Sequence, residues 1–149
     1  MKTVIVYDSV YGNTEKIAKS MGGAITGEVK VLRTDEVNLS ELESIELLIV
    51  GSPTYAGRPT PVMQDFLNKI PESAAKGVNI AAFDTRVGAK FARIFGYAAP
   101  KIANNLKVKG GTLIMSPGGF FVRGKEGPLI EGELERAANW AKEIASSKK

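Results

Sequence analysis

The chain has 149 residues, of which 44% are hydrophobic and 24% charged, and these proportions predict one compact domain over residues 1–149. The sequence contains neither cysteine nor histidine, which excludes disulfides, thiolate nucleophiles, Ser-His-Asp triads and Cys- or His-based metal centres. No apolar run approaches the roughly 18 residues that a membrane span needs, so we expect a cytoplasmic protein without a membrane partner.

The net charge of +4 is unevenly distributed along the chain. Residues 1–75 carry a net charge of −3 and residues 76–149 a net charge of +7. A basic stretch of this kind creates a positive field that can dock an anionic partner, but it can equally be a solvated surface that keeps the protein soluble. Between positions 85 and 125 every charged residue is basic: Arg86, Lys90, Arg93, Lys101, Lys107, Lys109, Arg123 and Lys125.

Short runs of β-branched and aliphatic residues predict five strands, separated by segments long enough for helices. The two runs at 4–7 and 47–50 are almost continuously apolar, as strands covered by helices on both faces must be. In the run at 29–33 charged and apolar residues alternate, which favours an edge strand. The predicted strands are, in chain order, residues 4–7, 29–33, 47–50, 79–83 and 112–115.

Between these runs the apolar residues recur at helical spacing, over residues 14–21, 61–70, 91–106 and 131–144. We expect Pro61 in a first helical turn, Gly22 and Gly23 at the end of the first helix, and a kink or break at Pro100. Parallel strands joined by right-handed helical crossovers predict an α/β fold, a doubly wound sheet with helices on both faces. Such sheets bind ligands beyond the carboxyl ends of their strands, so the loops after strands one, three and four are candidate site loops.

The loop after the first strand contains hydroxyls, one glycine and an amide, but no cation. The unpaired N–H groups at the start of the following helix can bind a phosphate, and the hydroxyls of Ser9 and Thr14 can donate as well. The alternative is that Ser9, Asn13 or Thr14 merely caps the helix. Neither a Gly-x-Gly-x-x-Gly nor a P-loop motif is present, which argues against a dinucleotide or ATP site.

The loop after the third strand, residues 51–59, is bounded by prolines and displays one aromatic residue, Tyr55. Together, the pattern Ser-x-Tyr-Gly-Asn-Thr at 9–14 and the run Gly-Ser-Pro-Thr-Tyr-Ala-Gly at 51–57 resemble the flavodoxin family, including the flavodoxin domains of larger flavoproteins. The resemblance covers essentially the whole chain, and it implies a five-stranded parallel sheet of order 2-1-3-4-5.

The resemblance implies FMN as the cofactor, with its phosphate on the first loop and its ring between the loops after strands three and four. Tyr55 stands where the family usually stacks an aromatic ring on the flavin. Gly57 is expected at positive φ in a type II turn, which lets the Ala56 carbonyl accept the proton on N5 of the reduced flavin. Asp84 and Thr85 could instead cap the next helix. The implied cofactor-binding residues are Ser9, Val10, Tyr11, Gly12, Asn13, Thr14, Pro53, Thr54, Tyr55, Ala56, Gly57, Asp84, Thr85 and Arg86.

The sequence departs from the family pattern at three points. Tyr11 stands where the phosphate motif usually has threonine. The loop after strand four has no aromatic residue before Phe91, so the flavin face on that side is expected to be either covered by Arg86 or left open. Typical flavodoxins are acidic, whereas this chain is basic, with Arg58, Arg86 and Lys90 expected near the flavin. Cations there favour the anionic reduced ring, so we expect a less negative semiquinone/hydroquinone potential and redox partner proteins with acidic docking surfaces.

The favoured function is an FMN-dependent electron carrier that works through the flavin semiquinone and hydroquinone, as a monomer or weak dimer. The alternative is an FMN-dependent NAD(P)H:quinone or flavin reductase on the same fold, whose basic segment would bind a nucleotide phosphate. A third possibility is a binding module without flavin, for an acidic protein or a nucleic acid. A nucleic-acid partner is disfavoured because the basic stretch lacks interleaved aromatics, and Phe120 and Phe121 are expected in the core.

Overall fold

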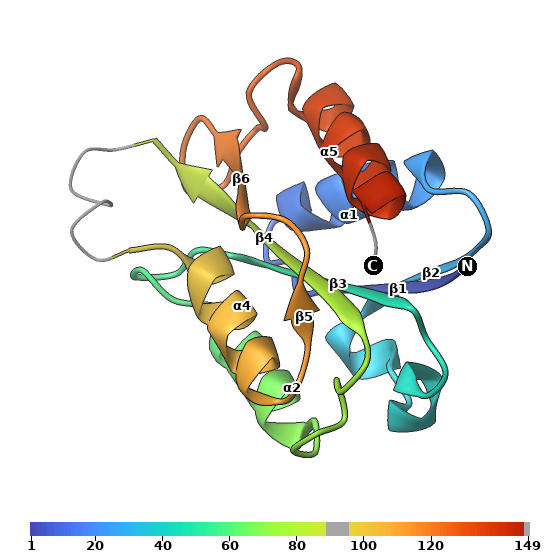
Figure 1. Cartoon of the computed structure of the whole chain (residues 1–149). Helices are drawn as coiled ribbons and strands as arrows, with labels where there is room; N and C mark the ends of the chain where they lie inside the picture. Colours follow the sequence, from blue (N-terminus) through green and yellow to red (C-terminus); the bar gives the residue numbers. More distant parts are fainter. Residues whose placement is uncertain (89–95, 148–149) are drawn as a thin grey trace.

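The computed structural model describes residues 1–88 and 96–147. Its helices lie on both sides of a central sheet (Figure 1). The strands are β1 (Lys2–Tyr7), β2 (Glu28–Arg33), β3 (Leu47–Pro53), β4 (Asn79–Val87), β5 (Thr112–Leu113) and β6 (Gly118–Val122). The helices are α1 (Asn13–Ala24), α2 (Pro61–Lys69), α4 (Ala98–Val108) and α5 (Glu133–Ser147), with short 3₁₀ turns η1 (Thr34–Glu36) and η2 (Leu39–Leu42).

The strands pair in the order β2-β1-β3-β4-β5, and every pairing in this order is parallel. The predicted fold class and strand order are therefore confirmed. The continuously apolar β3 lies at the centre of the sheet, and β2, with its alternating charges, lies at the edge as expected. The strand order reverses between β1 and β3, which places the ends of these two strands at the switch point.

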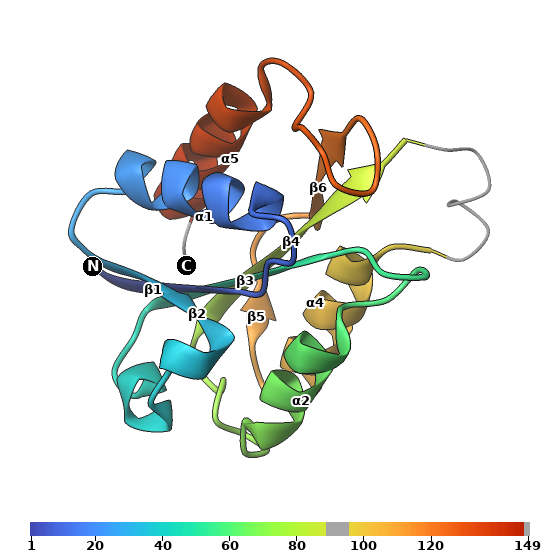
Figure 2. The ribbon, with the colours of Figure 1, turned by 180° about the vertical axis from the view of Figure 1, so that it is seen from behind.

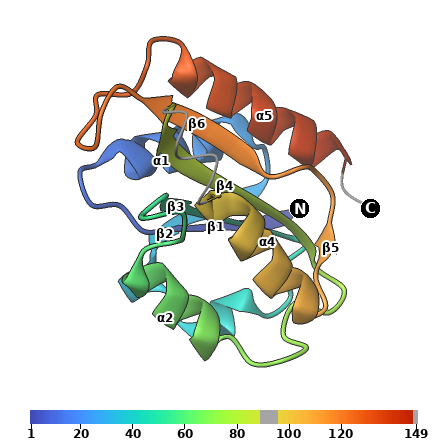
Figure 3. The same ribbon diagram turned by 90° about the vertical axis from the view of Figure 1, so that its left-hand side faces the viewer.

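Two separate apolar cores fill the space between the sheet and its helices. Alternate residues of a strand point to opposite faces, so Val4 and Val6 pack toward α2 and α4, while Ile5 and Tyr7 pack toward α1 and α5. Figure 3 shows the two layers above and below the sheet, and Figure 2 shows α1 beside α5 from behind. The sheet is thus held from both faces, and its carboxyl end is left to the loops.

The fifth predicted strand is divided into two pieces. We expected one strand at 112–115, but β5 ends at Leu113 and β6 then continues along the same edge of β4. Pro117, just before β6, has no N–H for a ladder hydrogen bond, which explains an interruption there. In β6, Phe120 is fully buried and packs edge-to-face on Phe83, as expected, whereas Phe121 is 36% exposed and does not belong to the core.

The end of α1 differs from the prediction, whereas the break expected near Pro100 is observed, because residues 96 and 97 are not helical and α4 begins at Ala98. Helix α1 does not stop at Gly22 but runs on to Ala24. A Cβ on Gly22 would lie 2.4 Å from a methyl carbon of Val31, so this glycine allows close packing against β2 rather than ending the helix. Pro100 lies in the first turn of α4, where proline is tolerated, and the earlier part of the predicted helix, 91–95, falls outside the described residues. Among the helices described, none is long and apolar enough to cross a membrane.

Candidate functional site

The carboxyl ends of β1, β3, β4 and β6 surround a cavity of about 320 Å³, within the usual size range of small-molecule sites. All three predicted loops reach it. Ten of the fourteen predicted site residues line it: Ser9, Val10, Tyr11, Asn13, Thr14, Pro53, Thr54, Tyr55, Thr85 and Arg86. Gly12, Ala56, Gly57 and Asp84 do not, and three lining residues were not predicted: Val87, Val122 and Lys125.

Helix α1 presents its N-terminus to this cavity. Its N-cap, Gly12, has φ +93°, a left-handed conformation that suits glycine. Because glycine has no side chain, the N-cap residue itself makes no capping hydrogen bond to the first turn. The hydroxyl of Ser9 accepts the N–H groups of Gly12 at 3.1 Å and Glu15 at 3.3 Å. The N–H groups of Asn13 and Thr14 have no partner among the residues that the structure describes. Capping therefore involves Ser9 alone, and two backbone donors remain for a ligand.

A cation behind the loop fixes its shape. Arg33, at the end of β2, donates to the Ser9 carbonyl at 3.0 Å and to the Glu15 carboxylate at 3.4 Å. Tyr7 donates its hydroxyl hydrogen to the same carboxylate at 2.7 Å. Burial, together with the neighbouring Glu15, raises the pKa of Tyr7 to about 12. The hydrogen bond from Tyr7, helped by Lys19 and Arg33, lowers the pKa of Glu15.

Tyr7→Phe should lower the free energy of unfolding by about 2 kcal/mol at neutral pH, because it removes one hydrogen bond to a carboxylate. The folded-state pKa of about 12 lies above the ordinary 10.0. This stabilisation is therefore complete below pH 10 and is lost as the pH rises through about 12. Urea denaturation of both proteins over this range should show the difference shrinking, and a difference independent of pH would contradict the assignment.

Tyr55 lies at one wall of the cavity in a two-residue hairpin. Its N–H donates to the Arg58 carbonyl at 2.7 Å, and the Arg58 N–H donates back to the Tyr55 carbonyl at 3.0 Å. The side chain of Tyr55 is 57% exposed, so one aromatic surface is available to a flat ligand.

The turn that closes this hairpin differs from the expected type II turn. Ala56 has φ +51° and Gly57 has φ +79°, and positive values at both central residues are the pattern of a type I′ turn. The reason is the hairpin itself, because type I′ turns match the twist of paired antiparallel residues better than type II turns. Glycine tolerates this conformation, but alanine in the left-handed region costs roughly 1 kcal/mol, so strain is stored at Ala56.

Asp84, Thr85 and Arg86, predicted in a loop after the fourth strand, instead continue β4 to Val87, because they pair with β3 and β6, and this end of β4 contains a buried ion pair. Asp84 is completely buried and accepts two hydrogen bonds from the Arg86 guanidinium, at 2.7 and 2.8 Å. Its carboxylate also accepts the N–H of Ala99 at 2.9 Å, in the first turn of α4. Asp84 thus takes the helix-capping role that we left open, and it lies behind the cavity wall rather than on it.

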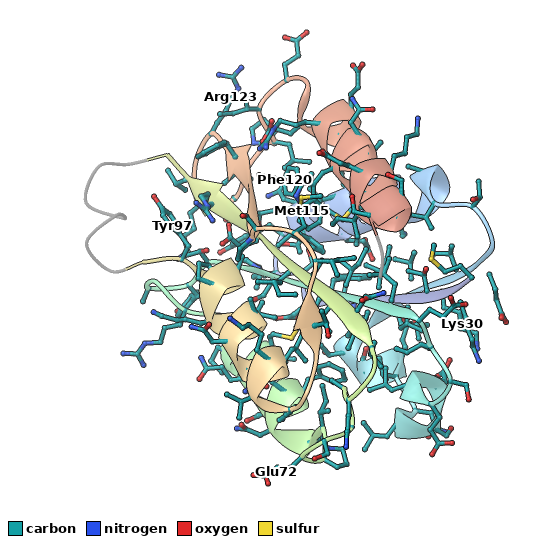
Figure 4. All side chains as sticks on the ribbon, in the orientation of Figure 1. Lys30, Glu72, Tyr97, Met115, Phe120 and Arg123 are labelled. Atoms are coloured by element: carbon teal, nitrogen blue, oxygen red, sulfur yellow. The ribbon has the colours of Figure 1, made fainter. Side chains whose placement is uncertain are left out.

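Arg86 lines the cavity, and its guanidinium is held by more than Asp84. It lies 3.5 Å from the ring centroid of Tyr97, an aromatic residue that the sequence analysis did not connect with the site. Figure 4 places Tyr97 at the carboxyl end of the sheet. A Cβ on Gly119 would lie 2.3 Å from Cζ of Arg86, so the missing side chain leaves room for the guanidinium. The predictions for Lys90 and Phe91 lie outside the described residues.

The loop at 123–128 reaches the cavity through a contact that no local pattern shows. The Asn13 amide donates to the Glu126 carbonyl at 3.2 Å. Gly127, at φ +99°, approaches so closely that a Cβ would lie 2.7 Å from the Asn13 side chain. This packing brings Lys125 to the cavity, whose described lining includes no acidic residue.

The basic stretch is only partly a surface feature. Lys109 is buried, its ammonium group donates to the Leu67 carbonyl at the end of α2, and burial lowers its pKa. Arg86 is neutralised by Asp84. Lys101, Arg123 and Lys125 are exposed. The stretch therefore divides into structural cations and exposed ones, and of the exposed ones Lys125 lines this cavity.

The fold and this cavity define a flavodoxin-like α/β protein. A model of the family described as Flavodoxin matches residues 5–140. The whole chain is 31% identical to a flavodoxin of Clostridium saccharobutylicum and covers 98% of it. The chain belongs to the flavodoxin family, as the two loops indicated, and membership implies flavin-mediated electron transfer.

Solved structures share the fold over the full chain. The structure of a flavodoxin from the domain Archaea superimposes with a TM-score of 0.82 at 26% identity, covering 98% of this chain and 97% of that one. The rubredoxin oxygen:oxidoreductase of Desulfovibrio gigas matches with a TM-score of 0.77 at 24% identity, but this chain covers only 35% of it. The same fold therefore occurs both in chains of similar length and as part of a longer chain.

Proposed function

We propose that this protein is an FMN-dependent electron carrier, which passes electrons singly, through the flavin semiquinone and hydroquinone, to separate redox proteins. One observation carries the proposal: a single cavity joins a helix N-terminus with unpaired N–H groups to an exposed tyrosine. These two features suit the two ends of FMN, an anionic phosphate ester and a flat aromatic ring. FMN would supply the redox chemistry, while the protein supplies binding, orientation and electrostatics.

The first loop holds the phosphate in this proposal. The N–H groups of Asn13 and Thr14 donate to it, and the hydroxyl of Ser9 lies at the same helix terminus. The partial positive charge of the helix end favours an anion without a cation in the loop. Arg33, bound to the Ser9 carbonyl from behind, keeps the loop in shape for this task.

The ring lies against Tyr55, where offset stacking contributes about 1 kcal/mol beyond burial. The Ala56 carbonyl, at the tip of the strained turn, would accept a hydrogen bond from the N–H that reduction creates at N5. Rotation of the Ala56–Gly57 peptide would bring this carbonyl toward the ring by changing ψ of Ala56 and φ of Gly57, while Ala56 would stay at positive φ. Gly57 accommodates either sign of φ, so the rotation would add no strain at this residue.

Arg86 and Lys125 set the charge at the cavity. Because Asp84 neutralises Arg86, the guanidinium acts mainly as a fixed donor, and Lys125 contributes the uncompensated positive charge. A cation beside the ring favours the anionic reduced form, so the second one-electron potential should be less negative than in acidic flavodoxins. Exposed Lys125 at the cavity, and the excess of basic residues in this half of the chain, suit redox partners with acidic docking surfaces.

Titration of the purified apoprotein with FMN tests the proposal. We expect quenching of flavin fluorescence that saturates at one FMN per chain, followed by two resolved one-electron steps in a potentiometric titration. Undimmed flavin fluorescence would contradict flavin binding. Rapid direct reduction by NAD(P)H in stopped flow, without a reductase, would favour the alternative NAD(P)H:quinone or flavin reductase.

A further inference from the structure

A second cavity, of about 350 Å³, is formed by residues of the hairpin segment, α2 and α4. It is distinct from the first cavity and shares no lining residue with it. Its lining combines two cations, three amides and two apolar residues: Arg58, Lys101, Gln64, Asn68, Asn105, Pro59 and Leu67.

The polar groups of this cavity favour an anion. Arg58 and Lys101 are exposed and bring two positive charges to it, and none of its described lining residues is acidic. The amide oxygen of Asn105 is buried and has no hydrogen-bond partner in the described part of the chain. The unpartnered atom of Asn105 is thus an acceptor, which would take an N–H from the backbone of a bound peptide.

The remaining lining residues suit a peptide better than a nucleotide. The Gln64 amide donates to the Pro59 carbonyl at 2.8 Å, which leaves its side-chain oxygen to accept an N–H from a ligand. Pro59 and Leu67 add apolar contact, and no aromatic residue among those described lines the cavity to stack on a base. We propose that this cavity binds a carboxylate side chain, Asp or Glu, from the docking segment of an acidic redox partner.

This cavity is linked to the proposed flavin turn by direct contacts. Arg58 lines it, while Tyr55, paired with Arg58 across the hairpin, lines the first cavity. The ammonium group of Lys101 donates to the Gly57 carbonyl at 2.5 Å. A carboxylate that binds Lys101 competes with the Gly57 carbonyl for the ammonium group. Docking of the partner is therefore expected to change the environment of the turn at Ala56 and Gly57. The inference rests on the proposed function, because the partner is the protein that exchanges electrons with the flavin.

The test is a titration of the ¹⁵N-labelled, FMN-loaded protein with acetylated, amidated hexaglutamate, followed by NMR. We expect shifts of the side-chain amides of Gln64, Asn68 and Asn105 and of the backbone amides of Gly57 and Arg58. Hexaglutamate should bind about tenfold more tightly than hexaglutamine at low salt, and the preference should fall as salt rises. Shifts confined to the surroundings of Arg123 and Lys125 would overturn the proposal.

Matched variants separate a built site from general charge attraction. Arg58→Gln and Asn105→Leu should each weaken hexaglutamate binding about fivefold. Lys107→Gln makes the same charge change as Arg58→Gln at an exposed position of α4 outside the cavity, and should leave binding within about twofold. Equal losses in Arg58→Gln and Lys107→Gln would show non-specific attraction and refute the site.

Two further arms complete the test. Displacement of hexaglutamate by NADPH, with shifts of the same amides, would assign the cavity to a nucleotide and overturn the proposal. The titration is repeated on apoprotein, because loss of FMN binding would refute the proposed function while the peptide titration still reports on the cavity. Asn105→Leu should retain wild-type FMN affinity, since Asn105 does not line the first cavity.

Discussion

Ser9→Asp should weaken FMN binding by about 100-fold or more while changing riboflavin binding little. The new carboxylate would lie beside the N–H groups of Gly12 and Glu15, at the helix terminus that we assign to the phosphate. Two unit charges about 4 Å apart repel by about 4 kcal/mol at an effective dielectric constant near 20, and each 1.4 kcal/mol is a factor of ten in affinity. Riboflavin lacks the phosphate and escapes this repulsion.

Fluorescence titrations with FMN and riboflavin measure both affinities. Asn139→Asp, an exposed position on α5, makes the same charge change as a control and should leave FMN affinity within about twofold. The Ser9→Asp apoprotein should remain folded, because a carboxylate near a helix N-terminus stabilises the helix. Equal losses for both flavins would mean that the phosphate does not bind at this loop.

Asp84→Ala should lower the free energy of unfolding by about 3–5 kcal/mol. The substitution removes both hydrogen bonds from the Arg86 guanidinium and leaves the N–H of Ala99 without its acceptor. Asp84 is completely buried, and the Arg86 side chain is only 15% exposed, so water replaces the lost partner poorly.

Urea denaturation of Asp84→Ala, Arg86→Met and the double variant measures the coupling between the two residues. We expect the double variant to lose much less than the sum of the single losses, because Arg86→Met removes the charge that Asp84→Ala leaves unpaired. Asp65→Ala, at an exposed site on α2, is the control and should cost within about 0.5 kcal/mol. Unchanged stability with a large loss of FMN affinity would instead place Asp84 against the flavin.

Much of the fold follows from local patterns in the sequence. The apolar runs that contain Val4 and Leu48 predicted central strands, because a strand covered on both faces has no polar positions to spare. The alternation at Lys30 predicted the edge strand. Ser9 and Tyr55 were predictable as site residues, since each lies in a loop that directly follows a strand, and the ends of parallel strands meet at one edge of the sheet.

Other parts of the site depend on contacts between residues far apart in the sequence. Lys125 reaches the cavity only because Asn13 binds the Glu126 carbonyl, and Tyr97 supports Arg86 across an intervening segment. The local sequence at Gly22 predicts a helix end, whereas in the structure this glycine allows α1 to pack closely against β2.

The sequence by itself determined the α/β class and the two loops that identify the family, because periodicity and loop composition act over a few residues. The order of the strands was predicted only through the family resemblance. The tertiary structure alone decided which cations remain exposed, as the contrast between buried Lys109 and exposed Lys107 shows. It also decided that Asp84 lies behind the cavity while Arg86 faces it. The burial of a charged side chain and its ion-pair partner depend on contacts between distant parts of the chain, so local sequence patterns do not predict them.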